Sequence, residues 1–107
     1  MSSKVYCIAE FLPKEGQEQA LFETLRALEP QTLREDGCIQ YRVTRHISSS
    51  FAEGTGFPIV FNEIWASMED FELHCQKDYI VNFFQRYCLD EKGLAAKWNV
   101  RVFSDEG

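Results

Sequence analysis

The feature that most constrains the fold is the stretch from Ile59 to Cys75, where a strand pattern changes into a helix pattern. Residues Ile59 to Ala66 are rich in β-branched and aromatic side chains and follow Pro58, which predicts a strand. Ser67 then fits a helix N-cap, since Asp70 stands at the third helical position and favours the positive helix start. We therefore expect a central strand that leads directly into a helix.

Each face of this strand carries one polar side chain among apolar neighbours. Because side chains alternate along a strand, the two sets are Phe61, Glu63 and Trp65 on one face and Val60, Asn62 and Ile64 on the other. His74 follows Phe71 by one helical turn, so it is placed to meet Glu63 and Trp65 around one hollow. A structural interpretation also fits, with Trp65 in the core, Glu63 facing solvent or a partner subunit, and His74 a hydrogen-bonded structural residue.

Three further strands and two helical regions follow from the remaining periodicity. The strands are expected over Lys4–Phe11, Cys38–Ile47 and Lys97–Phe103, and Ser48–Phe57 is expected to be a mobile hairpin loop. The first helix is predicted from the helical spacing of Ala20, Leu21, Leu25 and Leu28. Pro30 either kinks this helix or begins a short second one.

The second helical region lies between the last two predicted strands. It follows a weak break at Lys77-Asp78, and its apolar residues are Ile80, Phe83, Phe84, Tyr87 and Cys88. The residues from Asp90 to Gly93 are expected to end it. The order of elements is thus βαββαβ, which predicts a single ferredoxin-like α+β domain over residues 1–107.

A ferredoxin-like sheet has helices on one face only, yet the first and third predicted strands carry large apolar side chains on both faces. A second protein surface must cover the other face. We expect a symmetric homodimer in which two sheets pack face to face.

Charge and cysteine content narrow the class of protein. The net charge of −6 argues against nucleic acid and anionic membranes as partners, and neither a membrane-spanning segment nor a signal peptide is predicted. We therefore expect a cytoplasmic protein. Its four cysteines are expected to be reduced and mostly buried, and their spacing lacks the close pairs typical of a zinc site.

The chain resembles the antibiotic biosynthesis monooxygenase domains, and within them the small quinol monooxygenases. The resemblance spans nearly the whole sequence and is carried by Ile8-Ala9-Glu10, Glu35-Asp36-Gly37-Cys38, Glu63-x-Trp65-x-Ser67 and His74. It implies a dimeric α/β barrel that oxidises phenolic or quinol substrates with O2 and uses no metal, flavin or haem cofactor. One departure is that Lys77-Asp78-Tyr79 stands where related sequences often have Thr-Pro-His, which leaves one candidate histidine instead of two.

The first functional hypothesis is a cofactor-independent monooxygenase acting on a quinol or polyphenol. Its candidate base is His74, because imidazole titrates near neutral pH. Asn62 is the candidate donor to the developing anion, with Arg42 or Arg101 as alternatives. The candidate substrate-binding residues are Trp65, Tyr41 and Phe84 as aromatic walls, and Glu63 as a residue that orients a side chain or bridges the dimer.

Two other hypotheses stay open. The resembling family includes isomerases of small hydroxy-ketones, and enolisation needs the same base without O2. The third hypothesis is a non-enzymatic dimeric module that binds a small molecule, because one fold carries many functions. Oxygen uptake separates the first hypothesis from the other two.

Overall fold

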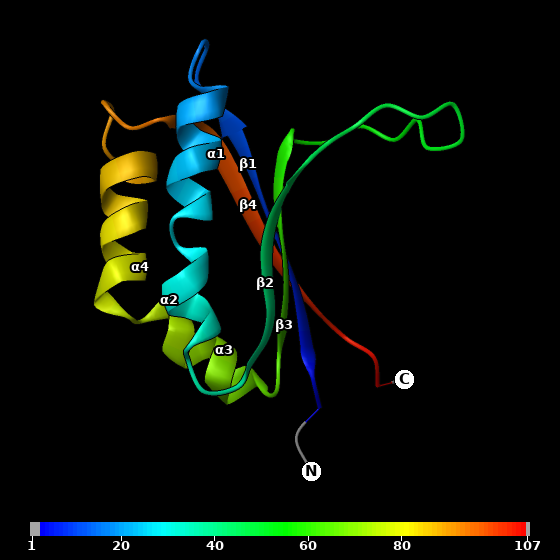
Figure 1. Ribbon diagram of the computed structural model, residues 1–107, viewed down its shortest axis with the longest axis vertical. Coiled ribbons are helices and arrows are strands. Elements are labelled where there is room, and N and C mark those ends of the chain that lie inside the picture. Colours follow the sequence, from blue (N-terminus) through cyan, green and yellow to red (C-terminus); the bar gives the residue numbers. More distant parts are fainter. Residues whose placement is uncertain (1–2, 107) are drawn as a thin grey trace.

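The computed structural model describes residues 3–106, which form an antiparallel sheet with helices on one face (Figure 1). The strands are β1 (Val5–Pro13), β2 (Cys38–Arg45), β3 (Ile59–Trp65) and β4 (Ala95–Ser104). Their order across the sheet is β2-β3-β1-β4, so β3 and β1 are the central strands. The predicted ferredoxin-like α+β fold is confirmed, as is the central position of the strand that begins at Ile59.

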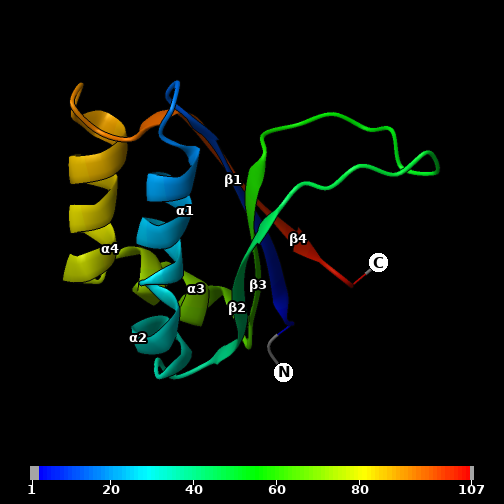
Figure 2. The ribbon, with the colours of Figure 1, turned by 45° about the horizontal axis from the view of Figure 1, so that its top comes forward.

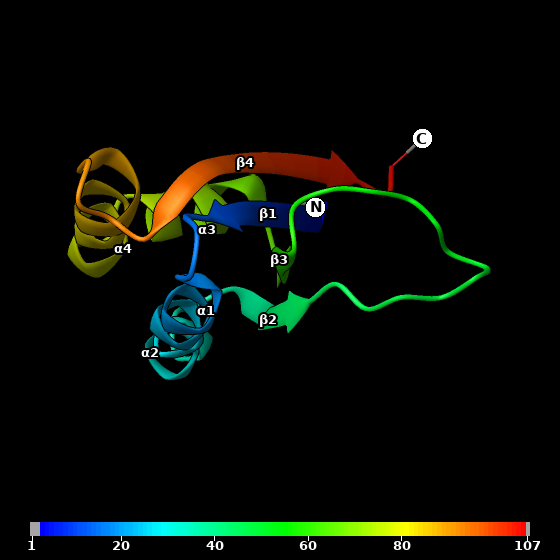
Figure 3. The same cartoon turned by 90° about the horizontal axis from the view of Figure 1, so that it is seen from above.

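The helices lie together on one side of the sheet (Figures 2 and 3). They are α1 (Glu18–Arg26), α2 (Glu29–Leu33), α3 (Met68–Cys75), α4 (Asp78–Phe83) and the π-helix η1 (Phe84–Leu89), which continues α4. Each of the two predicted helical regions is therefore divided. The single helical layer agrees with the sequence prediction.

Proline and local backbone geometry explain the boundary between α1 and α2 and the boundary between α3 and α4. Pro30 is the second residue of α2, where its missing N–H would have no helical partner in any case, so it begins a second helix instead of kinking the first. Lys77 has extended backbone (φ −63°, ψ 139°), which separates α3 from α4. The break predicted at Lys77-Asp78 is confirmed.

The junction from β3 to α3 is stabilised as the sequence predicts. Ser67 has extended backbone, and its Oγ accepts a hydrogen bond from the backbone N–H of Asp70 at 3.1 Å. Gly37, in the turn before β2, packs against this cap: its φ is +80°, and a Cβ there would lie 2.3 Å from the Asp70 carboxyl group. Both the backbone angle and the space favour glycine at this position.

The π-helix is a feature that the periodicity did not predict. The backbone N–H of Asp90 donates to the carbonyl of Gln85 at 3.0 Å, which is the i→i+5 pattern of a π-helix. Gly93 lies directly against this segment, where a Cβ would be 2.4 Å from the Tyr87 carbonyl oxygen. The chain can turn back toward β4 this closely because residue 93 has no side chain.

The core lies between the sheet and the helices, and alternate residues of β1 and β3 supply about half of it. The residues of these two strands that face the helices are Val5, Cys7, Ala9, Phe11, Ile59, Phe61, Glu63 and Trp65, all buried. The predicted face of β3 with Phe61, Glu63 and Trp65 is thus confirmed. The strand ends differ slightly from the prediction: β1 continues to Pro13, which pairs with Ala95, and β2 ends at Arg45 instead of Ile47.

The opposite face of the sheet has no helix over it among the described residues (Figure 3). Its apolar side chains include Tyr6, Ile8, Val60 and Ile64, which are partly exposed. The segment joining β2 to β3, residues 46–58, extends away from the body of the domain, and Phe51 in it is fully exposed (Figure 1).

All four cysteines are free thiols in the structure. Cys7 and Cys88 are buried, Cys38 is half-buried and Cys75 is exposed, so the prediction that the cysteines are mostly buried holds for two of the four. Among residues 3–106, none of the helices has the length and apolar character needed to cross a bilayer.

Candidate active site

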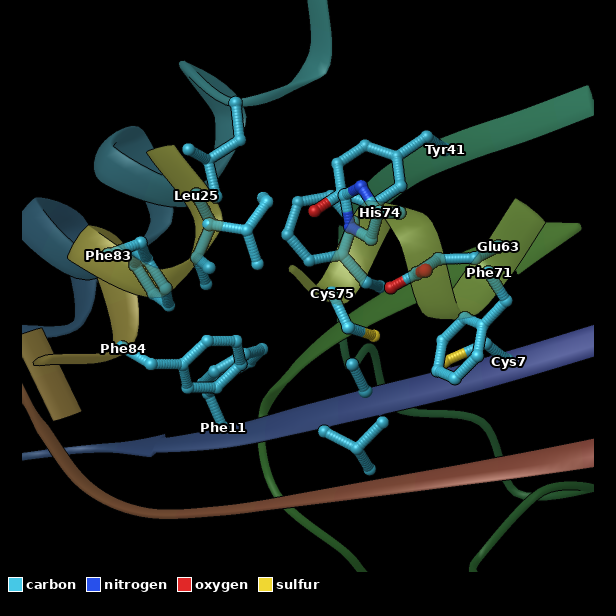
Figure 4. Close-up of a pocket in the computed structure, with 15 residues that line it drawn as sticks. Cys7, Phe11, Leu25, Tyr41, Glu63, Phe71, His74, Cys75, Phe83 and Phe84 are labelled. Atoms are coloured by element: carbon cyan, nitrogen blue, oxygen red, sulfur yellow. The ribbon is translucent and has the colours of Figure 1, made fainter. Parts of the chain in front are cut away.

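A cavity of about 210 Å³ lies between the sheet and the helical layer (Figure 4). The strands contribute Cys7, Ala9, Phe11, Tyr41, Phe61, Glu63 and Val100 to its wall. The helices contribute Leu25, Phe71, His74, Cys75, Ile80, Phe83 and Phe84, and the turn between α1 and α2 contributes Leu28. Most of this wall is apolar. The predicted residues His74, Tyr41, Phe84 and Glu63 are all brought to it.

The polar side chains gather at one end of the cavity. Glu63, His74 and Cys75 lie near Tyr41 and Cys7, whereas Phe11, Leu25, Phe83 and Phe84 close the opposite end (Figure 4). The apolar end contains a cluster of phenyl rings, with the Phe83 and Phe84 centroids 5.2 Å apart. The cavity therefore suits a molecule with a hydrophobic body and hydrogen-bonding groups at one edge.

Glu63 is the buried carboxyl group of the cavity, with 6% of its surface exposed. Its Oε1 accepts a hydrogen bond from the indole Nε1–H of Trp65 at 3.0 Å. Burial raises the pKa of Glu63 to about 7, although the hydrogen bonds from Trp65 and Cys7 oppose this change by favouring the carboxylate. Near neutral pH Glu63 is thus present both as a carboxylate, which only accepts hydrogen bonds, and as a carboxylic acid, which can also donate one.

His74 is held by a second carboxyl group that lies outside the cavity wall. Its Nδ1 is 2.9 Å from Oε2 of Glu35, and the same oxygen accepts a hydrogen bond from the hydroxyl of Tyr79. Burial lowers the pKa of His74, and the neighbouring Glu35 acts in the opposite direction. The imidazole is therefore neutral near pH 7, the form in which it accepts a proton.

Aromatic rings fix the orientation of the His74 side chain. The centroid of the Trp65 ring is 4.6 Å from that of His74, with 35° between the ring planes, and the Tyr41 ring lies edge-on at 5.3 Å. Trp65 is fully buried and contacts both Glu63 and His74, but it is not among the residues that line the cavity. Its predicted place near the site is observed, but it supports the wall instead of forming it.

The two thiols in the cavity wall are poor nucleophiles. Burial, together with the neighbouring Glu63, raises the pKa of Cys7. Cys75 is exposed as a whole residue, but it is partly enclosed in the cavity wall, and this enclosure together with Glu63 raises its pKa to about 11. Both side chains are thus protonated thiols at neutral pH, and the nucleophilic form is the thiolate. In this cavity the two thiols serve as small, polarisable groups of the wall.

Asn62 does not reach the cavity, so the structure does not support its predicted role as donor to the anion. It lies on the open face of β3, where its Nδ2 donates to Oγ1 of Thr44 at 3.1 Å. Arg42 pairs with Asn62 across the strands, and Arg101 pairs with Ile8, so both alternatives lie on the same open face. The physical reason is that successive side chains of β3 point to opposite faces of the sheet. The helices cover the face that carries Glu63, so Asn62 points to the other face.

Glu35 and Tyr79 are site residues that our functional reasoning missed. Glu35 belongs to the turn before β2 and is 39 residues from His74 in the chain, and Tyr79 is the second residue of α4. Glu35 was visible in the sequence as part of Glu35-Asp36-Gly37-Cys38, but local periodicity gives it no partner. Among the described residues, no three histidine, cysteine, aspartate or glutamate side chains are grouped so that they would hold a metal ion.

A family model described as antibiotic biosynthesis monooxygenase matches residues 4–86. Among solved structures, protein SO0527 from Shewanella oneidensis is 29% identical with a TM-score of 0.77, and the match covers 97% of this chain and 92% of that one. Rv0793 from Mycobacterium tuberculosis is 26% identical with a TM-score of 0.73, covering 94% and 93%.

A third solved structure shares the fold at lower identity. SnoaB from Streptomyces nogalater, described as a cofactor-independent oxygenase, is 13% identical with a TM-score of 0.68, and the match covers 99% of this chain and 96% of that one. The comparison with curated proteins gave no match. Since the family model covers most of the sequence, the chain belongs to the antibiotic biosynthesis monooxygenase family.

Proposed function

We propose that this protein is a cofactor-independent monooxygenase that oxidises a quinol or polyphenol with O2. The observation that carries the proposal is the division of one buried cavity into an end with phenyl rings and an end with His74 and Glu63. An aromatic substrate would place its ring system among Phe11, Phe83 and Phe84 and its hydroxyl groups at the polar end. Family membership supports the same reaction class.

In this reaction His74 is the general base. Its neutral imidazole accepts the proton of a substrate hydroxyl, and the resulting anion is electron-rich enough to pass an electron to O2. For a hydroquinone the balanced outcome is a hydroxyquinone and water: one oxygen atom forms a bond to a ring carbon, and the other leaves as water. The substrate supplies all four electrons that reduce O2. The protein therefore has to bind the substrate, deprotonate it and exclude water from the cavity.

Glu63 is proposed to hold the second polar group of the substrate. Its Oε1 is occupied by the Trp65 indole, which fixes the carboxyl group, and its pKa of about 7 lets it either accept a hydrogen bond from a hydroxyl or donate one to a developing oxyanion. Tyr41 and Phe84 serve as walls, as proposed from the sequence.

The protein is further proposed to act as a homodimer. The face of the sheet away from the helices carries Tyr6, Ile8, Val60 and Ile64 as partly exposed apolar side chains, with Phe103 exposed beside them. Polar side chains such as Asn62 and Arg101 lie among them, but several large apolar side chains exposed on one face still favour association in water. A second copy packed sheet to sheet would cover it.

The experiment that tests the proposed function is O2 uptake with a series of reduced naphthoquinones and polyphenols. His74→Gln keeps a donor for Glu35 but removes the base, so we expect quinol-dependent uptake to fall by about 10²–10⁴-fold. His46→Ala is the matched control, because His46 is the second histidine of the chain and is exposed in the loop after β2. Equal uptake by wild type and His74→Gln would remove His74 as the base.

The absence of any uptake by the wild type above the uncatalysed rate would contradict the monooxygenase itself. Conversion of a hydroxy-ketone without O2, lost in His74→Gln, would then favour the isomerase.

A further inference from the structure

A hydrogen-bonded chain of side chains begins at His74 and leads away from the cavity. Oε2 of Glu35 accepts from Nδ1 of His74 at 2.9 Å and from the hydroxyl of Tyr79. The Tyr79 oxygen is in turn 2.9 Å from Oγ1 of Thr32, and since Tyr79 donates to Glu35, Thr32 is the donor in this last contact. Three elements meet here, because Thr32 lies in α2, His74 in α3 and Tyr79 in α4.

This chain connects two separate hollows. His74 lines the inner cavity, whereas Glu35 and Tyr79 line a polar hollow on the outer surface, together with Gln31, Arg34, Asp36, Lys77, Asp78 and Asn82. Glu35 is therefore in contact with the imidazole on one side and lies at the edge of the outer hollow on the other, with its side chain 9% exposed. No other step is needed to reach the surface from His74.

We propose that Glu35 is the positioning residue of His74 and that Glu35 and Tyr79 together form the outlet through which the substrate proton leaves the cavity. The inference rests on the proposed function for its catalytic meaning. Its structural part, the control of the His74 ring by Glu35 and Tyr79, is testable without any substrate.

The positioning role follows from hydrogen-bond chemistry. A carboxylate oxygen accepts and does not donate, so the proton of the neutral His74 ring is on Nδ1. Nε2 is then the nitrogen with a free lone pair, which is the form that a base requires. The burial of His74 and its packing on Trp65 prevent the ring from turning to another arrangement.

The outlet role follows from the proton balance. When Nε2 takes the substrate proton, the substrate O–H bond breaks, an Nε2–H bond forms and the ring becomes an imidazolium. The Nδ1 proton then passes to Glu35, which leaves a neutral ring with its proton on Nε2, and Glu35 releases the proton to water in the outer hollow. Later in the cycle Nε2 gives its proton to the oxygen atom that leaves as water, and a proton from the outer hollow returns through Glu35 to Nδ1. The Nδ1–H form is thereby restored, the complete cycle releases no proton, and the relay needs no oxidant or reductant.

Charged and titratable groups around His74 determine how the test is designed. Glu35 comes from the turn before β2, Tyr41 from β2, Glu63 from β3 and Tyr79 from α4, while Cys75 and Lys77 lie next to His74 in the chain. Lys77 lowers the pKa of His74 and Glu35 raises it. Because Tyr79 donates to the same oxygen of Glu35 that His74 contacts, loss of Glu35 and loss of the Tyr79 hydroxyl are expected to move the titration of His74 in opposite directions.

The experiment is ¹⁵N NMR of the histidine rings across a pH series. Glu35→Gln removes the negative charge and is expected to lower the His74 midpoint by roughly 1–3 pH units. Tyr79→Phe removes a competing donor from the Glu35 carboxylate, which then interacts more strongly with His74, so the midpoint is expected to rise. His46 in the same spectrum is the internal reference, and Glu72→Gln and Tyr87→Phe are matched controls outside the chain of contacts.

The results separate this inference from the proposed function. If neither variant shifts the His74 midpoint beyond the change at His46, or if both shift it in the same direction, the positioning role is wrong, whether or not the wild type consumes O2. Opposite shifts confirm it even when no substrate has been found. With an active wild type, the acid limb of the kcat/KM profile must follow each NMR midpoint, and an acid limb that stays fixed overturns the outlet.

Discussion

Replacing Glu63 by glutamine makes the cost of burying its charge measurable. Glutamine has nearly the same shape, and its amide oxygen can still accept the Trp65 Nε1–H bond that Glu63 Oε1 accepts in the structure. The variant therefore keeps the packing of the cavity wall but cannot ionise. Any difference in pH dependence between the two proteins belongs to the Glu63 carboxyl group.

The size and sign of the effect follow from the pKa of Glu63, which burial raises from 4.5 to about 7. Because the folded protein binds this proton more tightly than the unfolded chain, the contribution to stability is fully present below pH 4.5 and is lost as the pH rises toward 7. At about 1.4 kcal/mol for each pH unit, the loss is on the order of 3 kcal/mol. Above pH 7 both states are ionised and the difference no longer changes.

The assay is urea unfolding of wild type and Glu63→Gln between pH 4.5 and 8.5 at one fixed protein concentration, since association also affects stability. We expect the free energies of unfolding of wild type and variant to be closest at pH 4.5. Between pH 4.5 and pH 8 the free energy of unfolding of the variant should rise by roughly 3 kcal/mol relative to that of the wild type. Glu72→Gln, on the exposed face of α3, is the control and should show no such trend. A constant difference between wild type and Glu63→Gln at every pH would refute the buried-charge interpretation.

Two further predictions concern the fold and the assembly. Gly37→Ala should destabilise the protein by about 2 kcal/mol or more in urea unfolding, because Gly37 has a φ of +80° and a Cβ would overlap the Asp70 carboxyl group. Gly54 has open space around it, so the control Gly54→Ala should change the free energy of unfolding by less than about 0.5 kcal/mol. Equal effects of the two substitutions would contradict this account of the turn. Light scattering at micromolar concentration should give twice the 12.5 kDa chain mass, and Ile8→Glu on the open sheet face should give the monomer; a monomeric wild type would contradict the proposed dimer.

Local patterns were sufficient to predict most of the fold. The alternation from Ile59 to Trp65 identified the central strand and its buried face, and the cap at Ser67 identified the start of α3. Both signals depend only on residues close together in the chain, which is why they are readable from sequence. The π-helix η1 has no such signal, because its geometry depends on the close packing of Gly93 against Tyr87.

The candidate site was only partly predictable for the same reason. Glu63 and His74 lie on faces that periodicity identifies, and both line the cavity. Asn62 was chosen for its chemistry, although the alternation had already placed it on the other side of β3 from Glu63. The contact between Glu35 and His74 spans 39 residues and depends on how the turn before β2 packs on α3, which no local pattern specifies.

The central claim is that the cavity supports transfer of one oxygen atom from O2 to an aromatic ring. The most direct measurement is mass spectrometry of the product formed from a reduced naphthoquinone under ¹⁸O2, with His74→Gln measured in parallel to give the uncatalysed reaction. The account predicts one ¹⁸O atom bonded to a ring carbon of the product, the second ¹⁸O atom in water, and loss of the labelled product in His74→Gln. A product without ¹⁸O, or equal labelling by wild type and His74→Gln, would contradict it.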